Sequence, residues 1–123
     1  LIVDYGYLNN LMMDSLQAVK NHKKVNILKN YGSSDITYNI NFNLIENISK
    51  YLNLKSQGIT TQRNFLLKLG ILERAEIISK NLPFSKKANI YFRLKRLIDK
   101  NQMGELFKVM LITNKKIKFQ IGF

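Results

Sequence analysis

Four residues near the start of the chain, Asp4-Tyr5-Gly6-Tyr7, combine a carboxylate, two phenols and a glycine in one short run. They follow Leu1-Ile2-Val3, a continuous apolar run that predicts the end of a buried strand. Ligands of open α/β sheets bind beyond the carboxyl ends of the strands. We therefore expect these four residues to leave the strand at a ligand-binding edge, with Gly6 marking a turn or a close backbone approach.

Two further residues are candidates for chemistry at the same edge. His22 is the single histidine of the chain, and Asp35 begins an alternating stretch. The alternatives are that His22 is structural and that Asp35 is a turn residue that bonds to its own backbone. Because the chain has no cysteine and its eight acidic residues are scattered, thiol chemistry is excluded and we expect no metal site.

The net charge of +12 permits two interpretations. A nucleic acid or an anionic membrane surface would be attracted to such a chain. However, lysine supplies most of the charge and is spread along the sequence, whereas arginine, the usual contact to bases and phosphates, is scarce. We therefore favour a solvated lysine surface over a nucleic-acid interface. No apolar run approaches the roughly 20 residues that a membrane span requires, so we expect no membrane span.

The remaining pattern predicts strands that are separated by helices. The expected elements are an extended segment over 15–22, an alternating strand or extended arm over 36–42, a helix over 44–52, a short strand over 55–61, helices over 62–69, 72–81 and 85–99, a long buried strand over 104–113 and an alternating segment over 116–123. Asn41 or Asn43 is expected to cap the first helix, Thr60 or Thr61 the second, and Gly70 follows the second in the usual C-terminal position. The apolar face expected for the first helix is formed by Leu44, Ile45, Ile48 and Leu52.

This order of elements predicts an α/β fold. An apolar strand at residues 1–3 has nothing N-terminal to cover its other edge, although a doubly wound sheet has strands on both sides of its switch point. The segment is therefore expected to be the second half of such a sheet.

Several stretches together resemble the C-terminal half of the MidA family of class I S-adenosylmethionine-dependent methyltransferases. The matching pieces, in the family's order, are LIVDYGY at 1–7, SLQAVKNHK at 15–23, SDITYNINF at 34–42, TTQRNFLLKLGILERAE at 60–76, QMGELFKVMLI at 102–112 and the closing GF. The chain differs from the family pattern at Met13 and Arg63, which stand where Gly is common, and at Asn39 and Asn41, which stand where a His and an Asp are common.

The resemblance implies that residues 1–123 are the C-terminal part of a single methyltransferase domain with a Rossmann-like sheet and flanking helices. Residues 1–7 would be the fifth strand and the turn after it, while the glycine-rich turn and the acidic residue that bind S-adenosylmethionine would lie upstream. We therefore expect S-adenosylmethionine to be the cofactor of the full-length family and to bind this chain alone weakly or not at all.

The resemblance also implies a protein substrate, namely an arginine on a subunit of respiratory complex I. Asp4, Tyr5 and Tyr7 would line the pocket of the methyl acceptor, with Gly6 letting the backbone pass close; the alternative is that Asp4 only hydrogen-bonds the turn. The implied location is the cytoplasm in a bacterium or the mitochondrial matrix in a eukaryote. Further partners would be the N-terminal half or a second copy bound at the exposed sheet edge.

Two other functions stay open at this point. Residues 63–81 contain a helix, a glycine turn and a helix, which resembles a DNA-binding helix-turn-helix, but the second helix carries Glu73 and Glu76 where a recognition helix would use basic or amide side chains. The other alternative is an inactive remnant of a split gene.

Overall fold

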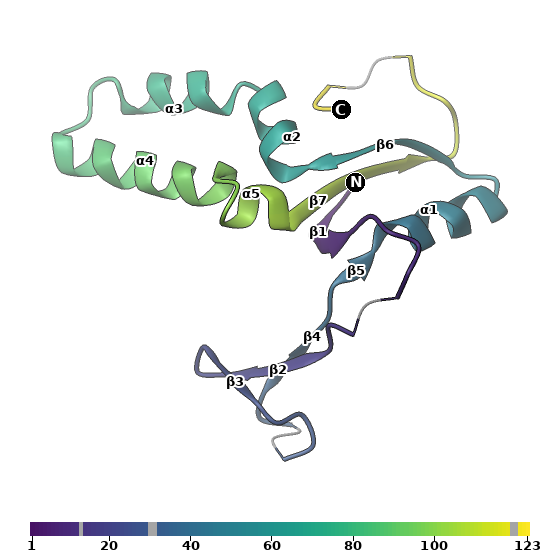
Figure 1. The fold of residues 1–123 in the computed structure, drawn as a ribbon. Coiled ribbons are helices and arrows are strands. Elements are labelled where there is room, and N and C mark those ends of the chain that lie inside the picture. The colour runs from purple at the N-terminus through teal and green to yellow at the C-terminus, as the bar shows by residue number, and fades with distance from the viewer. Residues whose placement is uncertain (13, 30–31, 119–120) are drawn as a thin grey trace.

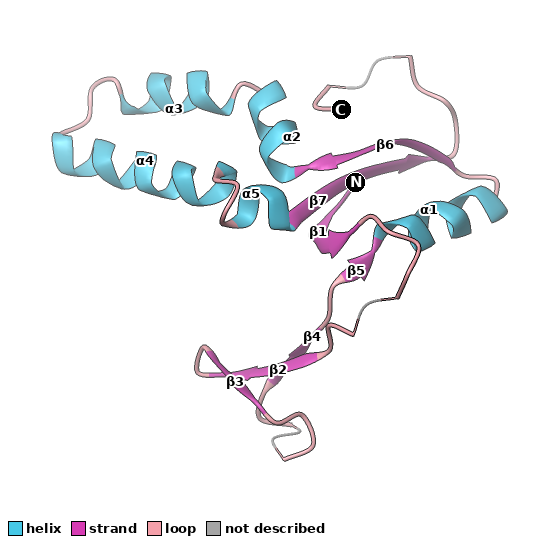
Figure 2. Cartoon of the chain, viewed as in Figure 1, coloured by secondary structure: helices cyan, strands magenta, loops and turns pink. Residues whose placement is uncertain are grey.

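The computed structural model describes residues 1–12, 14–29, 32–118 and 121–123. These residues form two separate sheets and a layer of helices (Figures 1 and 2). The strands are β1 (Ile2–Tyr7), β2 (Gln17–Lys20), β3 (Lys23–Val25), β4 (Asp35–Thr37), β5 (Ile40–Asn41), β6 (Lys55–Thr61) and β7 (Phe107–Thr113). The helices are α1 (Phe42–Tyr51), α2 (Gln62–Lys68), α3 (Ile71–Ser79), α4 (Phe84–Ile98) and α5 (Met103–Leu106).

The main sheet has four strands in the order β5-β1-β7-β6. β1 is parallel to β5, whereas β7 is antiparallel to both of its neighbours, β1 and β6. The three largest fully buried side chains belong to this sheet and to the helix that follows β5: Val109 and Met110 of β7, and Phe42 of α1. The predicted mixture of strands and helices in an α/β fold is confirmed.

The first strand is longer than predicted, and it is not buried at its beginning. The turn expected over Asp4–Tyr7 is wrong, because Asp4 and Tyr5 pair with β7 while Gly6 and Tyr7 pair with β5. Leu1 is 67% exposed and Val3 is 47% exposed. The reason is that β5 covers only the end of β1, so that no described strand pairs with the outer edge of residues 2–5. The uncovered edge that the sequence predicts is therefore present.

Gly6 allows the two parallel strands to approach each other. A Cβ atom at this position would lie 2.2 Å from the carbonyl oxygen of Ile40 and 2.8 Å from Cε2 of Phe42. Real Cβ atoms do not come so close to backbone oxygens, so only glycine fits here without moving β5. The predicted close approach at Gly6 is confirmed, and the backbone that approaches is the chain's own.

Helix α1 begins where the sequence indicates, but it packs through a different face. The side chain of Asn41 accepts a hydrogen bond from the backbone N–H of Leu44 at 3.2 Å, which identifies Asn41 as the N-cap. Phe42 and Ser49 are buried, whereas Leu44, Ile48 and Leu52 are exposed. The predicted apolar face is therefore wrong, because Phe42 at the helix start turns α1 toward β1.

The helical layer extends from one end of the main sheet (Figure 1). Thr61 caps α2 by accepting from the N–H of Asn64 at 3.2 Å, and Gly70 follows α2 with a φ of 75°. Two side chains of α2 then hold the end of α4, because Gln62 donates to the carbonyl of Leu97 at 2.9 Å and Arg63 to that of Ile98 at 2.6 Å. The carbonyls that a helix leaves unpaired at its C-terminus are satisfied in this way.

Two predicted boundaries near the C-terminus change. The strand expected over 104–113 starts only at Phe107, because Met103–Leu106 form the short helix α5. The alternating segment over 116–123 forms no strand in its described residues, 116–118 and 121–123. Instead, the ring of Phe123 packs on Gly58 of β6 and lies 5.4 Å from the ring of Phe65.

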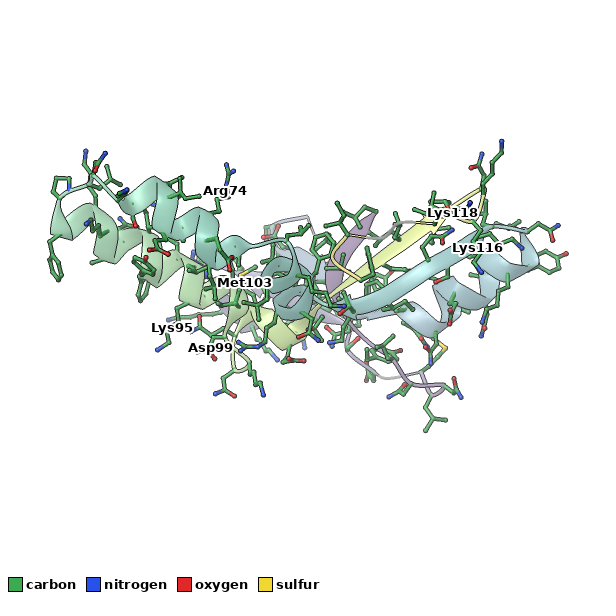
Figure 3. All side chains as sticks on the ribbon, turned by 90° about the horizontal axis from the view of Figure 1, so that it is seen from above. Arg74, Lys95, Asp99, Met103, Lys116 and Lys118 are labelled. Carbon is green, nitrogen blue, oxygen red and sulfur yellow. The ribbon has the colours of Figure 1, made fainter. Side chains whose placement is uncertain are left out.

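Cationic side chains are distributed over several sides of the molecule. Figure 3 shows Arg74 on one side of the helical layer, Lys95 on the opposite side, and Lys116 and Lys118 at the far end of the main sheet. The exposed residues of α3 include Glu73 and Glu76. This distribution fits a solvated charged surface and gives no support to α3 as a recognition helix.

The steric role of Gly6 predicts the effect of adding a methyl group. Gly6→Ala is expected to lower the free energy of unfolding by about 1–3 kcal/mol, because the added carbon overlaps the backbone of β5. Gly32→Ala is the control, since no atom of the described residues lies within 4 Å of the added carbon and the positive φ of 73° opposes the substitution. Urea unfolding followed by circular dichroism would measure both variants, and equal losses would contradict the steric explanation.

Candidate functional site

A cavity of about 350 Å³ lies where the parallel strands β1 and β5 end. This is the edge at which open α/β sheets bind their ligands. The volume lies within the range of small ligand pockets. The lining residues come from the end of β1, the segment before β2, the segment from β4 through β5, and the first turn of α1: Tyr7, Met12, Asp14, Ser15, Leu16, Tyr38, Asn39, Ile40, Asn41, Leu44 and Ile45.

The lining combines polar oxygen atoms with apolar walls. Tyr7 and Tyr38 contribute phenols, Asp14 contributes a carboxylate, and Asn39 and Asn41 contribute amides. The walls between them are aliphatic and thioether side chains. A cationic, planar ligand with an apolar stem would find both hydrogen-bond acceptors and apolar contact here.

Backbone pairing and two side-chain hydrogen bonds hold the lining in place. Tyr7 pairs with Asn41 across β1 and β5. The hydroxyl of Ser15 accepts a hydrogen bond from the N–H of Asn39 at 2.9 Å, which joins the segment before β2 to the segment after β4. With Asn41 capping α1, the cavity is built from segments whose positions depend on one another.

Of the four candidate residues Asp4–Tyr7, the structure places only one at the cavity. Tyr7 lines the cavity, but Asp4, Tyr5 and Gly6 lie further back along β1 and do not belong to its lining. Asp4 Oδ1 accepts a hydrogen bond from the N–H of Tyr5 at 2.8 Å. The ring of Tyr5 packs edge-on against Phe107, with centroids 5.6 Å apart.

His22 and Asp35 lie in the second sheet and do not line the cavity. Asn21 and His22 form the turn between β2 and β3, both with positive φ, of 50° and 61°. This is the geometry of a type I′ hairpin, in which Asn is favoured at the first position. Asp35 starts β4 and pairs with Val19.

Sequence reasoning missed most of the cavity. None of Asp14, Ser15, Tyr38, Asn39 and Asn41, which line it, had been named as a candidate for chemistry. Four of them lie in stretches shared with the MidA pattern, whereas Asp14 lies outside those stretches. Asn39 and Asn41, which replace a His and an Asp of that pattern, place two neutral amides in the lining. Met13, a third difference from the pattern, lies outside the described residues.

A second, smaller hollow of about 260 Å³ adjoins the first and shares Met12, Asn41 and Leu44 with it. Among the described residues, the others that line it are asparagines: Asn9, Asn10, Asn43 and Asn47. The amide of Asn43 donates to the side-chain oxygen of Asn10 at 3.2 Å, which links α1 to the loop after β1. The rim of the cavity is thus neutral and rich in groups that both donate and accept hydrogen bonds.

The described residues do not fit S-adenosylmethionine in the manner of a glycine-rich turn. Such a turn follows a strand and opens a helix, so that the backbone can approach the cofactor. Here the space beside Gly6, Gly58, Gly104 and Gly122 is filled by other atoms of the chain. Gly70, which precedes α3, follows a helix and not a strand.

The described residues contain neither a cluster of metal ligands nor a membrane-spanning helix. Their histidine and carboxylate side chains form no group of three that could hold a metal ion. None of their helices is both long enough and apolar enough to span a membrane.

Comparison with known proteins gives consistent matches. A family model described as "Putative S-adenosyl-L-methionine-dependent methyltransferase" matches residues 1–60. The protein arginine methyltransferase NDUFAF7 of Danio rerio is 28% identical over 114 residues, which cover 93% of this chain and 26% of that protein. The NDUFAF7 homologue of Caenorhabditis elegans is 38% identical over 74 residues, which cover 60% of this chain and 17% of that protein. The chain thus spans about a quarter or less of the length of these relatives.

Two crystal structures from Burkholderia thailandensis share the fold. Both are COG1565 superfamily proteins that are 24% identical to this chain, with TM-scores of 0.81 and 0.76. The matches cover 90% of this chain and 31% and 30% of those chains, and the second structure contains S-adenosyl-homocysteine. The family model, the relatives and the shared fold together support a MidA-like family of S-adenosylmethionine-dependent methyltransferases for this chain.

Proposed function

We propose that the protein methylates an arginine side chain of another protein and that these 123 residues form the wall of the site that faces the methyl acceptor. The observation that carries the proposal is the cavity at the ends of β1 and β5, in a chain whose relatives include protein arginine methyltransferases. Methyl transfer is a displacement that depends on positioning the acceptor and excluding water. A cavity built from four interlocked segments supplies such positioning.

The lining supports a guanidinium as the acceptor group. A guanidinium is planar and presents five N–H donors and no acceptor, so its binding site must provide oxygen atoms. Tyr7, Asp14 and Asn39 of the lining would provide them, whereas the side-chain oxygen of Asn41 already accepts the N–H of Leu44. Leu16, Leu44 and the neighbouring apolar side chains would contact the aliphatic stem of the arginine.

S-adenosylmethionine, the cofactor of the family, would supply the methyl group. Because no glycine of the described residues forms a cradle for it, we assign no cofactor contact to this chain. Its residues act on the acceptor side: Tyr7 and Asp14 would orient the guanidinium, and the apolar wall would exclude water. Asp4 and Tyr5, which precede Tyr7 in β1, would hold Tyr7 in position.

The protein acceptor and its location are also part of the proposal. The resemblance to the MidA family suggests a subunit of respiratory complex I. The mitochondrial relatives favour the mitochondrial matrix for a eukaryotic protein, and the cytoplasm would be the corresponding place in a bacterium.

Removal of a single hydroxyl group tests the role of Tyr7. In the whole protein, Tyr7→Phe is expected to lower kcat/KM for the protein acceptor about tenfold, because one hydrogen bond to a charged group is lost. The KM for S-adenosylmethionine is expected to stay unchanged. Transfer of tritium from labelled cofactor to a purified complex I subunit would measure both. Tyr51→Phe, at the exposed end of α1, is the matched control and should leave both constants unchanged.

Asp4→Asn separates the two roles considered for Asp4. The amide oxygen of Asn can still accept the hydrogen bond from the N–H of Tyr5, so the fold is expected to be preserved while the negative charge is lost. If Asp4 contributes charge to the acceptor side, the methylation rate falls about tenfold. An unchanged rate and acceptor KM would leave Asp4 with the structural role alone.

Calorimetry tests whether this chain binds the cofactor by itself. Titration of S-adenosylmethionine into the 123-residue chain is expected to give no binding heat or an affinity weaker than about millimolar, since no glycine cradle is formed by the residues that the structure describes. Micromolar affinity would contradict this assignment. A folded chain, verified by circular dichroism, is the necessary control.

A further inference from the structure

The second sheet forms an arm that projects from the main sheet (Figures 1 and 2). We use the term arm for residues 17–37, which contain β2, β3 and β4. The strand order is β3-β2-β4, with both pairings antiparallel. Within the part of the chain that the structure describes, β3 and β4 therefore each have one edge that no strand covers.

The two edges of the arm differ in how they are protected. Proteins commonly place lysines on edge strands to prevent pairing with other chains. β3 carries Lys23 and Lys24, both exposed, whereas β4 has the sequence Asp35-Ile36-Thr37 and no lysine. Ile36 is 53% exposed, and Tyr38, directly after β4, is 62% exposed. Of the two edges, that of β4 is open to another strand and carries apolar side chains that such a strand would cover.

The edge of β4 continues directly into the candidate site. β4 ends at Thr37, and the next four residues, Tyr38, Asn39, Ile40 and Asn41, all line the cavity. The hydrogen bond from Asn39 to Ser15 fixes this passage from the arm to the cavity. A polypeptide lying along β4 would therefore reach the cavity with its next few residues.

We propose that an extended segment of the acceptor protein adds to the outer edge of β4 as a further strand and that this pairing delivers its neighbouring arginine to the cavity. The inference rests on the proposed function and deepens it by naming how the protein substrate is held. Strand addition takes its affinity from main-chain hydrogen bonds and its preference for sequence from alternate side chains. A cavity of this size holds one side chain, so the remaining contacts to a protein substrate must lie elsewhere, and the arm provides them.

The charge of the arm indicates what kind of segment it holds. The cations of residues 17–37 are lysines at 20, 23, 24 and 29, and the single acid is Asp35. Lys20 donates to Ser33 at 3.1 Å, so at least one of the lysines is positioned by the arm itself. An excess of lysine attracts acidic side chains and disfavours basic ones. The arm as a whole therefore favours an acidic segment beside the arginine, whereas Asp35, on β4 itself, favours a neutral or basic side chain directly opposite it.

Peptides that are methylated on their backbone nitrogens test the pairing directly. The probe is a fluorescein-labelled peptide with one arginine followed by alternating threonine and glutamate, and its binding to the protein without cofactor is followed by fluorescence anisotropy. In a paired strand, alternate N–H groups face the partner. N-methylation of one alternate set is expected to weaken binding about tenfold, while methylation of the other set has little effect.

A substitution on the edge strand β4 provides a second test of the pairing. Ile36→Lys places on β4 the kind of residue that protects β3, and it is expected to weaken binding of the unmodified peptide about tenfold. Leu28→Lys is the matched control, because Leu28 is also an exposed aliphatic residue of the arm but lies outside its strands. It makes the same change in charge and should leave binding within about twofold.

Several outcomes would overturn the proposal. These are no binding of the unmodified peptide, equal effects of the two N-methylated sets, and equal effects of the two lysine variants. A dimer that Ile36→Lys dissociates, detected by light scattering, would assign the edge to a second copy of the chain instead. Because binding is measured without cofactor, these results are independent of the methylation assays that test the proposed function.

Discussion

The close approach of β5 to β1 at Gly6 is the constraint on which the rest of this structure depends. A hydrogen atom in place of a side chain lets the carbonyl of Ile40 and the ring of Phe42 occupy the space beside the strand. That contact places the chain from Tyr38 to Asn41 at the carboxyl end of β1 and starts α1 at Phe42, which is completely buried. The positions of the cavity, of its asparagine rim and of the segment that joins the arm to β5 all depend on this close contact between β1 and β5.

Local signals predicted the helices well, because their information lies within a few residues of sequence. Asn41 and Thr61 are caps whose side chains reach a backbone N–H three residues later, and Gly70 adopts the positive φ that ends α2. The strands were predicted less well. Asp4–Tyr7 continue β1 only because β7, about a hundred residues later in the sequence, lies beside Asp4 and Tyr5. No local pattern contains that information.

The cavity was beyond local prediction for the same reason. The alternating stretch from Ile36 to Phe42 indicates an extended chain, and the structure divides it into β4, a short link and β5. Nothing in its alternation shows that Asn39 will bond to Ser15 or that Asn41 will pair with Tyr7. Resemblance to a family pointed to the right stretches, whereas the choice of residues within them required the fold. His22 illustrates a different case, since its residue type suggested chemistry and the structure places it in a hairpin turn.

Arg63 shows how a difference from the family pattern can be accommodated. It stands where glycine is common, yet its guanidinium donates to the carbonyl of Ile98 and works together with Gln62 on the end of α4. Helices α2 and α4 are therefore joined by side chains that bind backbone atoms, a kind of bond that is insensitive to the side chains of the partner helix.

The separation of the arm from the main sheet has an evolutionary consequence. Its strands pair only with one another, and apart from Ala18 none of their residues is fully buried. Mutations in the arm are therefore expected to have little effect on the folding of the main sheet, so that, under the proposed function, natural selection could alter protein recognition by the arm without changing the cavity.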